Sequence, residues 1–332
     1  MYDIISIGSS TRDVFLKSEG YELIKGGVFS TGQGQCFPLG SKVEVKKIVF
    51  TGGGGGANAA VTFGRQGLAT ACIGVVGQDF KGKELLELLE RDGVDTKYFQ
   101  KHDDDLTAYS VILVTDEGER TILSYKGEGQ HFDVAKIPFD QLETKWLYLD
   151  SLGGHFELLE KAVAWAAGKG VRLATTPGTK ELAHGIEKLR PLLKQFTVVA
   201  MNQEEAAGLS GIPYEKEAEI FKFMDEVVPG IFVMTKGPQG VVVSDGTHRY
   251  RAGVPDSPIV ERTGAGDAFS SGFITEYFRA TERQETSDQA IIKAIQFATA
   301  NASSVVTEYG ALAGILKKDD WGPWPLVEVS VE

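Results

Sequence analysis

Short apolar runs alternate with segments of helical periodicity along most of the chain, and this alternation restricts the possible folds more than any other feature. Buried strands are indicated at 4–7, 71–76, 146–149, 171–175 and 196–201. Parallel strands need long crossover connections, which are usually helices, so this rhythm is typical of a parallel sheet covered by helices. The sequence therefore predicts an α/β fold with a central, mainly parallel sheet between helices.

Two stretches, residues 14–50 and 106–127, interrupt this rhythm with alternating polar and apolar residues. A hairpin signal lies at 115–119. The strand signals within the two stretches fall at 42–46, 108–114 and 120–125. Because both stretches leave the same α/β body, we expect them to meet in a small sheet over one edge. The sequence has no internal repeat and no low-complexity linker, so one domain over residues 1–332 is expected.

The composition limits the classes of partner. The net charge is −12 and the pI is about 5.0, which argues against binding to nucleic acid or to an anionic membrane surface. Two cysteines, Cys36 and Cys72, are too few for a disulfide framework or a zinc site. The N-terminus lacks the basic region of a signal peptide, and no apolar run approaches the roughly 20 residues of a membrane-spanning helix. We therefore expect a cytoplasmic protein that binds a small molecule.

A run of small residues at 263–266 opens directly into a segment of helical periodicity that begins at Asp267. Backbone N–H groups at such a turn, together with the positive end of the helix, form a site for an anion. Gly264 and Gly266 let the backbone around Ala265 approach that anion, because neither has a Cβ. The carboxylate of Asp267 has two explanations. It accepts a proton from a hydroxyl that attacks a bound phosphate, or it simply suits the helix dipole.

Five consecutive glycines, 52–56, follow a strand and lead into a helix that contains Asn58. They match the loose G-x-G-x-x-A dinucleotide fingerprint, and Asp79 at the end of the next strand suits its ribose-binding carboxylate. An NAD(P)-dependent oxidoreductase is therefore one alternative. The other is a backbone around Gly53 and Gly54 that approaches a polyhydroxylated ligand, to which Asn58 offers a donor and an acceptor.

Polar residues follow other strands as well. Asn202 and Glu205 either form a capping box or place a carboxylate near Mg²⁺. Asp13, just past the first strand, is either a turn residue or an acceptor for ligand hydroxyl groups. The run from Gly77 to Lys83 nearly spells a P-loop, but Glu84 replaces the Ser or Thr that would hold Mg²⁺, which favours a plain turn. Strand ends of this kind share one edge of an open parallel sheet, where ligands bind.

Together these segments resemble the ribokinase-like (PfkB) carbohydrate kinase family over nearly the whole chain. Residues 263–269 look like its C-terminal signature, and 53–58 with Gly-x-Asp-x-x-Gly at 77–82 look like its N-terminal signature. Asn202-x-x-Glu205 is similar to its magnesium motif. The resemblance implies a three-layer ribokinase-like fold in which the two β stretches form a small lid, and in this family the lid often makes the dimer contact.

By the same resemblance, the reaction is transfer of the γ-phosphoryl group of ATP to a sugar hydroxyl, with Asp267 as the base. The backbone of Gly264, Ala265 and Gly266 would bind the transferred group, and Glu205 would serve Mg²⁺. The expected sugar contacts are Asp13, Gly53, Gly54, Asn58 and Asp150. The expected ATP contacts are Asn202, Thr235, Gly237, Thr263 and Asn301.

Three features depart from the family pattern. Glu261-Arg262 precedes the turn where ribokinases typically show Asp-Thr. The family's monovalent-cation (K⁺) site is therefore doubtful in this chain, and Arg262 could instead reach a phosphate or an acidic group. Thr11 stands where ribokinase has Asn, and the segment 17–48 is longer than usual. Ribose specificity therefore does not follow from the resemblance.

The expected function is that of an ATP- and Mg²⁺-dependent sugar kinase, homodimeric through its lid. The first alternative is an adenosine-like nucleoside kinase, which needs an apolar slot for the base. Aromatic residues that could supply this slot are Phe15, Phe29, Phe37 and Tyr109. Outside this class remain the NAD(P)-dependent oxidoreductase and a sugar-binding protein without catalysis.

Overall fold

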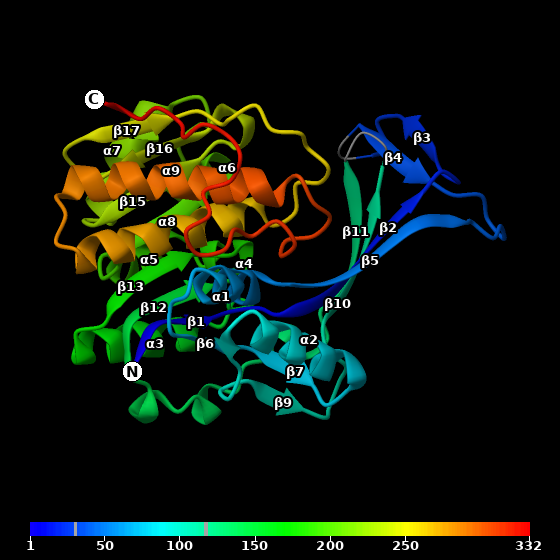
Figure 1. Cartoon of the computed structure of the whole chain (residues 1–332), viewed down its shortest axis with the longest axis horizontal. Coiled ribbons are helices and arrows are strands. Elements are labelled where there is room, and N and C mark those ends of the chain that lie inside the picture. Colours follow the sequence, from blue (N-terminus) through cyan, green and yellow to red (C-terminus); the bar gives the residue numbers. More distant parts are fainter. Residues whose placement is uncertain (30–31, 116–118) are drawn as a thin grey trace.

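A main sheet runs through the computed structural model, which describes residues 1–29, 32–115 and 119–332 (Figure 1). Its strands are β1 (Tyr2–Ile7), β6 (Thr70–Ile73), β8 (Val94–Asp95), β12 (Thr144–Asp150), β13 (Arg172–Thr176), β14 (Val198–Asn202), β15 (Ile231–Thr235), β16 (Val241–Ser244), β17 (Arg249–Ala252) and β18 (Ser330–Val331). Their order is β18-β17-β16-β15-β14-β13-β12-β1-β6-β8. Neighbours from β15 to β8 are parallel, and β16, β17 and β18 are antiparallel. The predicted mainly parallel sheet is confirmed.

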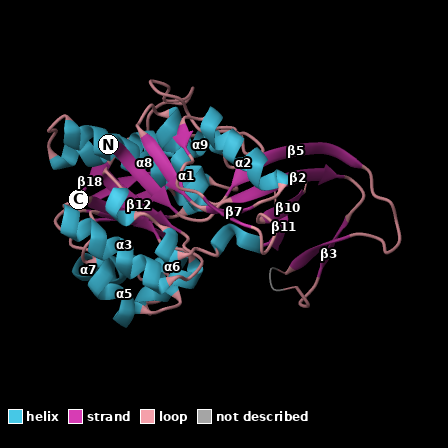
Figure 2. Cartoon of the chain, turned by 90° about the horizontal axis from the view of Figure 1, so that it is seen from below, coloured by secondary structure: helices cyan, strands magenta, loops and turns pink. Residues whose placement is uncertain are grey.

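Helices cover both faces of this sheet (Figure 2). They are α1 (Gly55–Arg65), α2 (Phe80–Arg91), α3 (Phe156–Lys169), α4 (Thr179–Leu182), α5 (Ile186–Leu193), α6 (Gln203–Ser210), α7 (Glu217–Val227), α8 (Ala265–Glu282) and α9 (Ser287–Val305), with 3₁₀ turns η1 (Gly127–Gln130), η2 (Val134–Lys136), η3 (Phe139–Gln141) and η4 (Gly237–Gln239). Phe63, Phe273 and Ile295 pack α1, α8 and α9 on one face. Leu158 and Phe221 belong to the core on the other face, under α3, α5, α6 and α7. The three layers of the predicted α/β class are therefore present.

A second, four-stranded sheet projects from this body, and we call it the side sheet (Figure 1). It consists of β2 (Thr11–Ser18), β5 (Val45–Gly53), β10 (Tyr109–Val114) and β11 (Arg120–Tyr125), in the order β11-β10-β2-β5. The two β stretches of the sequence meet where β2 pairs with β10 in parallel. The centre of the predicted hairpin turn, 116–118, lies outside the described residues, but β10 and β11 pair as its two arms.

Some predicted boundaries are wrong. The alternating run 42–46 belongs to a strand only from Val45, because β2 ends at Ser18, which pairs with Val45. The run 71–76 is divided between β6 and β7 (Val75–Gly77), which pairs with β9 (Gln100–His102) instead of continuing in the main sheet. A separate hairpin of β3 (Glu22–Lys25) and β4 (Gln33–Cys36) lies beyond the side sheet.

None of the helices among the described residues is long and apolar enough to cross a membrane.

Candidate active site

The strands of the main sheet bring the candidate residues to one edge. Asp150, the last residue of β12, lies opposite Thr176 in β13, and Asn202, the last residue of β14, lies opposite Thr235 in β15. These are the carboxyl ends of parallel strands, the usual place for ligands in an open α/β sheet. Helices α1 and α8 begin near the same edge, because Asn58 and Asp267 contact one another there.

Asp267 lies in the first turn of α8 and is held from α1. The Asn58 Nδ2 donates a hydrogen bond to the Asp267 Oδ2 at 2.7 Å. Asn58 is buried, and its Oδ1 has no hydrogen-bond partner among the described residues. Burial by the surrounding chain raises the pKa of Asp267, against the effect of the bond from Asn58. A carboxylate with a raised pKa is better matched to proton transfer near neutral pH than an ordinary one.

The glycines of the turn before Asp267 serve different purposes. Gly264 has a φ of 80°, and a Cβ there would collide with Ala311, so both conformation and packing require glycine. Gly266 is exposed, and a Cβ there would meet nothing within 4 Å. The first N–H groups of a helix have no partner within it. The turn therefore presents backbone donors to open space beside Asp267, as an anion site requires.

Asp150 is a second buried carboxylate in this site, with an exposed fraction of 5%. The Tyr148 hydroxyl lies 3.1 Å from its Oδ2 and 2.8 Å from the Thr176 Oγ1. Burial and the charge of Asp267 raise the pKa of Asp150 well above its usual range. A Cβ on Gly55 would collide with the Asp150 carboxylate. This glycine therefore leaves room for the acid.

Asp13 completes the group from the side sheet. Thr11 Oγ1 donates to its Oδ1 at 3.1 Å, and a Cβ on Gly53 would collide with its carboxylate. Burial raises the pKa of Asp13, against hydrogen bonds from Ser110 and Thr11. Gly54 has a φ of 89°, and a Cβ there would lie 2.5 Å from the Ser9 carbonyl oxygen. The glycine run thus packs against the carboxylates of Asp13 and Asp150 and against the backbone that follows β1.

The residues of the dinucleotide alternative are used differently. Asp79 caps α2, where its Oδ1 accepts from the Gly82 N–H at 2.7 Å, and its Oδ2 accepts from the Thr107 N–H at 2.8 Å. Its carboxylate is therefore engaged in fixing the turn from Gly77 into the helix. The plain-turn interpretation of this segment agrees with that geometry.

Asn202 and Glu205 form the capping box, since the Glu205 N–H donates to Asn202 Oδ1 at 2.8 Å and the Asn202 N–H donates to Glu205 Oε2 at 2.9 Å. The cap does not remove Glu205 from the site. Burial raises the pKa of Glu205, and the charge of Asp267 adds to this effect against the bond from Asn202. Glu205 is therefore both a cap and a neighbour of Asp267.

The other residues expected near ATP are more scattered. Thr235 lies beside Asn202, and Gly237 follows in η4 with a φ of 55° and open space around it. Thr263 donates from its N–H and its hydroxyl to Glu261. Asn301 is wholly buried: its Nδ2 donates to the Ala268 carbonyl at 2.8 Å, and its Oδ1 accepts from the Leu316 N–H at 2.9 Å. These two hydrogen bonds hold α9 against α8 and against the segment at Leu316, and the role of Asn301 near ATP stays a prediction.

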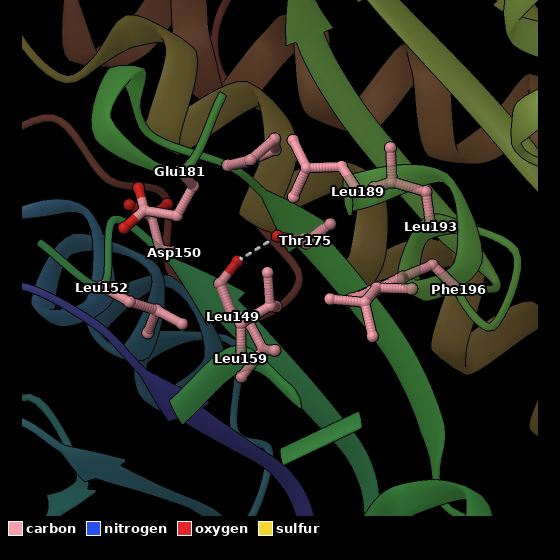
Figure 3. Close-up of a pocket in the computed structure, with 11 residues that line it drawn as sticks. Leu149, Asp150, Leu152, Leu159, Thr175, Glu181, Leu189, Leu193 and Phe196 are labelled. Atoms are coloured by element: carbon pink, nitrogen blue, oxygen red, sulfur yellow. Dashed lines mark hydrogen bonds between the residues drawn. The ribbon is translucent and has the colours of Figure 1, made fainter. Parts of the chain in front are cut away.

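Glu181 is a residue of this edge that the sequence did not single out (Figure 3). It lies on α4 with an exposed fraction of 3%; its Oε1 accepts from the Gly154 N–H, and its Oε2 has no hydrogen-bond partner among the described residues. Its charge contributes to the raised pKa of Asp150. Beneath the two acids is an apolar cavity lined by Leu149, Leu159, Leu189 and Phe196. No motif marks Glu181, since only the tertiary fold brings it to Asp150.

The four aromatic residues considered for a nucleobase do not line one slot. Phe15 is buried among Ile112 and Val114 on one face of the side sheet. Tyr109 belongs to the opposite face, because its register partner in β2 is Arg12. Phe37 packs edge-on against Tyr21, and Phe29 lies against Gly34 in the outer hairpin.

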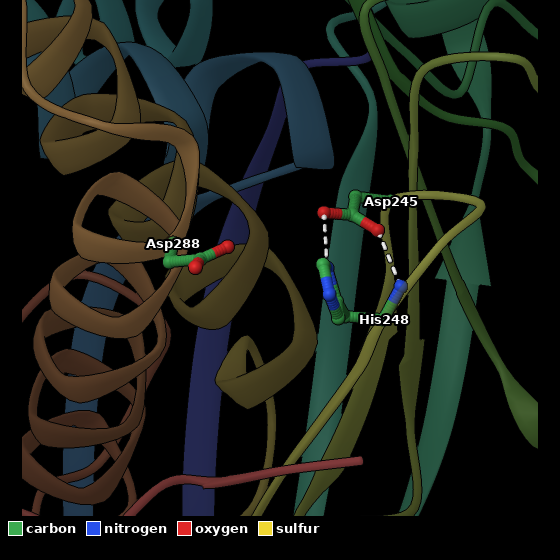
Figure 4. A group of neighbouring side chains, drawn as sticks. All are labelled: Asp245, His248 and Asp288. Atoms are coloured by element: carbon green, nitrogen blue, oxygen red, sulfur yellow. Dashed lines mark hydrogen bonds and ion pairs between the residues drawn. The ribbon is translucent and has the colours of Figure 1, made fainter.

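A second acidic group lies at the opposite edge of the main sheet (Figure 4). Asp245, His248 and Asp288 place one ligand atom each within 4.8 Å of one another. Asp245 accepts hydrogen bonds from the N–H groups of Thr247 and His248, and the Tyr250 hydroxyl contacts Asp245 at 3.1 Å and Asp288 at 2.6 Å. Ser244 pairs with Phe232 near the start of β15, which puts this group far along the strands from Thr235.

Comparison with known proteins agrees with this geometry. Residues 2–318 match the model of the pfkB family carbohydrate kinases. A ribokinase from Haemophilus influenzae is 28% identical over 272 residues, covering 79% of this chain and 83% of the relative. A nucleoside kinase from Methanothermobacter thermautotrophicus is 26% identical over 277 residues, covering 83% and 84%.

Solved structures share the fold. The ribokinase of Giardia lamblia superposes with a TM-score of 0.78 at 19% identity, covering 96% of this chain and 98% of that one. The ribokinase of Arabidopsis thaliana, solved with ribose and ATP, gives a TM-score of 0.71 at 20% identity, covering 95% and 96%. The predicted ribokinase-like fold is confirmed, and family membership argues against the oxidoreductase alternative. The chain belongs to the pfkB carbohydrate kinase family and is an ATP-dependent phosphotransferase.

Proposed function

We propose that this protein transfers the γ-phosphoryl group of ATP to a hydroxyl of a neutral sugar. The observation that carries the proposal is the position of Asp267. Its carboxylate is fixed by Asn58 at 2.7 Å and lies at the helix terminus where Gly266 leaves open space. A base and an anion site are thereby adjacent, which is the arrangement that in-line phosphoryl transfer to a hydroxyl needs.

Each part of the site has a role in this proposal. Asp267 accepts the proton of the attacking hydroxyl, and Asn58 keeps its carboxylate oriented. The N–H groups of Gly266 and Asp267 would donate to the oxygens of the transferred group, whose negative charge they stabilise. The Ala265 N–H, which donates to the Arg262 carbonyl at 3.4 Å, would have to exchange that bond to join them. Asp13 and Asp150, with the backbone of Gly53 and Gly54, accept from or approach the remaining sugar hydroxyl groups.

ATP and Mg²⁺ belong at the neighbouring strand ends. Asn202, Thr235, Gly237 and Thr263 would line the nucleotide, and the Glu205 carboxylate is a donor of the kind that Mg²⁺ prefers. Its partial burial beside Asp267 fits a site that gathers a cation between them. When bound, the metal neutralises charge on the phosphates.

The charges of the site favour a neutral acceptor over a sugar acid or a sugar phosphate. Asp13, Asp150, Glu181 and Asp267 are carboxyl groups of one site, and the first three are buried. Hydroxyl groups can donate to such acceptors, whereas a carboxylate or phosphate on the acceptor would be repelled. The scattered positions of Phe15, Tyr109 and Phe37 give a nucleobase no aromatic slot, so the sugar is favoured over the nucleoside.

We further propose that residues 1–332 act as one domain whose side sheet is the lid and the contact of a homodimer. The register places Val14, Phe50, Val111 and Leu123 in one row on the outer face of the side sheet. Phe50 and Leu123 are exposed, with exposed fractions of 49% and 56%. A second copy would cover this apolar face.

The first experiment measures ADP release from MgATP with D-ribose, D-fructose, adenosine, cytidine and 2-keto-3-deoxygluconate. We expect turnover with a neutral sugar and a loss of about 10²- to 10⁴-fold in kcat for Asp267→Asn, since that change removes the base but keeps the shape. The acceptor class is wrong if the sugar acid is the best substrate. The mechanism is wrong if Asp267→Asn turns over as fast as wild type.

A further inference from the structure

The segment that leads into the phosphate-binding turn is shaped by a buried carboxylate. Glu261 has an exposed fraction of 0%. Its Oε1 accepts from the Thr263 N–H at 2.8 Å and from the Thr263 hydroxyl at 2.5 Å. The Val260 and Glu261 N–H groups both donate to the Val306 carbonyl, at 2.8 and 3.2 Å. Glu261 thus sets the conformation of the residue immediately before Gly264.

The charge that compensates Glu261 comes from the side sheet. Arg120, the first residue of β11, places its Nε 3.2 Å from the Glu261 Oε1. This contact is an ion pair without hydrogen-bond geometry, since the Arg120 Nε has no hydrogen-bond partner among the described residues. The Glu261 Oε2 has no hydrogen-bond partner among the described residues. A buried carboxylate is costly unless a partner of opposite charge accompanies it. The conformation around Thr263 therefore depends on Arg120, a side chain from a distant part of the sequence. Arg120 stands next to Glu119, which is the partner of Arg262.

That neighbouring contact joins the same two segments on the surface. The Arg262 Nη1 donates to the Glu119 Oε1 at 3.0 Å, and these side chains have exposed fractions of 48% and 57%. Solvent and salt screen such a pair, so it contributes little. Glu119 is therefore a matched control for Arg120. It is the neighbouring residue in the chain, and it pairs with Arg262, the residue next to Glu261, but its ion pair is exposed.

We propose that Arg120 is a positioning residue for phosphoryl transfer. Through Glu261 and Thr263, it fixes the turn from Gly264 to Asp267 and ties this turn to the side sheet. The inference rests on the proposed function for its kinetic consequence only. The contact between Arg120 and Glu261 is a property of the folded chain, and its effect on the turn can be measured without a substrate.

The test compares Arg120→Ala with Glu119→Gln in the full chain. Hydrogen exchange at the amides of residues 263–267 reports the order of the turn. We expect exchange to become at least about tenfold faster in Arg120→Ala and to stay within about twofold of wild type in Glu119→Gln. With MgATP and the best neutral sugar, we expect kcat to fall at least about tenfold, while the KM for the sugar changes less than about threefold.

Two results would overturn the proposal. One is a folded Arg120→Ala protein whose exchange at 263–267 matches wild type. The other is a Glu119→Gln protein that changes as much as Arg120→Ala. If Arg120→Ala does not fold, Arg120→Gln replaces it, because it removes the charge but keeps much of the side chain, and the same outcomes apply. If wild type phosphorylates no compound, the proposed function fails. The hydrogen-exchange comparison still tests whether Arg120 orders the turn at 263–267.

Discussion

The two acidic groups at opposite edges of the main sheet differ in how their charges are satisfied. Asp245 accepts hydrogen bonds from two backbone N–H groups and from Tyr250. Asp288 is exposed and accepts from Tyr250. At the other edge, Asp150 is buried near Asp267, and glycines make room around it. A satisfied acidic group fastens a turn to a helix. An acidic group whose pKa values are raised by burial, with open space beside it, is prepared to bind and react.

Among the variants that compare the two edges, the largest effect is expected from exchanging one exposed glycine at each edge for alanine. A Cβ at either Gly266 or Gly246 would meet nothing within 4 Å, but only Gly246 has a positive φ, of 84°. Gly266→Ala should place a methyl group where the anion approaches and reduce kcat/KM by about 10-fold or more, with little change in Tm. Gly246→Ala should lower stability by about 1 kcal/mol and leave kcat/KM unchanged.

Steady-state kinetics and thermal melts of both variants check this comparison. If Gly266→Ala loses stability and keeps activity, or Gly246→Ala does the reverse, the assignment of the two edges is wrong.

A second test uses pH, because the two edges should respond with opposite sign. Burial and the charge of Asp267 raise the pKa of Asp150 in the folded chain. Its contribution to stability is therefore fully present below the usual carboxyl pKa of about 4. This contribution is lost as the pH rises through the raised pKa. The Tm of Asp150→Asn relative to that of wild type should therefore rise as the pH is raised above about 4.

Asp245 should behave in the other direction. Although burial opposes it, hydrogen bonds from the His248 and Thr247 N–H groups lower the pKa of Asp245. Its contribution is present above the usual carboxyl range and is lost as pH falls through the lowered pKa. Asp245→Asn should be less stable than wild type at pH 7, and the difference should shrink toward pH 3. Melting curves of both variants across pH check this contrast. It is contradicted if the difference in Tm from wild type changes with pH in the same direction for both variants.

The smallest expected effect is that of Asp288→Asn. This change weakens one hydrogen bond from Tyr250, at 2.6 Å, while Asp245 remains available to the same hydroxyl. We expect kcat/KM within about twofold of wild type and a fall in Tm of about 2 °C or less. A large loss of activity would show that the second edge takes part in the reaction after all.

The part of the site that the sequence predicted is the part with local signals. The turn at 263–267, the glycines before Asn58 and the Asn202–Glu205 pair each follow a strand or start a helix, so the parallel sheet alone brings them to one edge. The same logic predicted that the two β stretches would meet, and β2 pairs with β10.

What the sequence did not predict depends on contacts between distant segments. Nothing near Glu181 signals that α4 will bury it beside Asp150. The pairing of Glu261 with Arg120 likewise joins segments with no common motif. The burial of Asn301 and its hydrogen bonds to the Ala268 carbonyl and the Leu316 N–H were also not predicted. Burial and partner choice are tertiary properties, and periodicity carries little information on them.

The connections of the side sheet have a mechanical consequence. Only residues 8–10 separate β1 from β2, and Gly54 alone separates β5 from α1. Asp13 and Gly53 therefore lie at the base of the side sheet, where β2 and β5 join the main body. A tilt of the side sheet about this base would displace the far ends of its strands more than it displaces Asp13 and Gly53. In the proposed lid movement, the groups that we propose as sugar contacts would therefore stay close to Asp267 while the outer strands move.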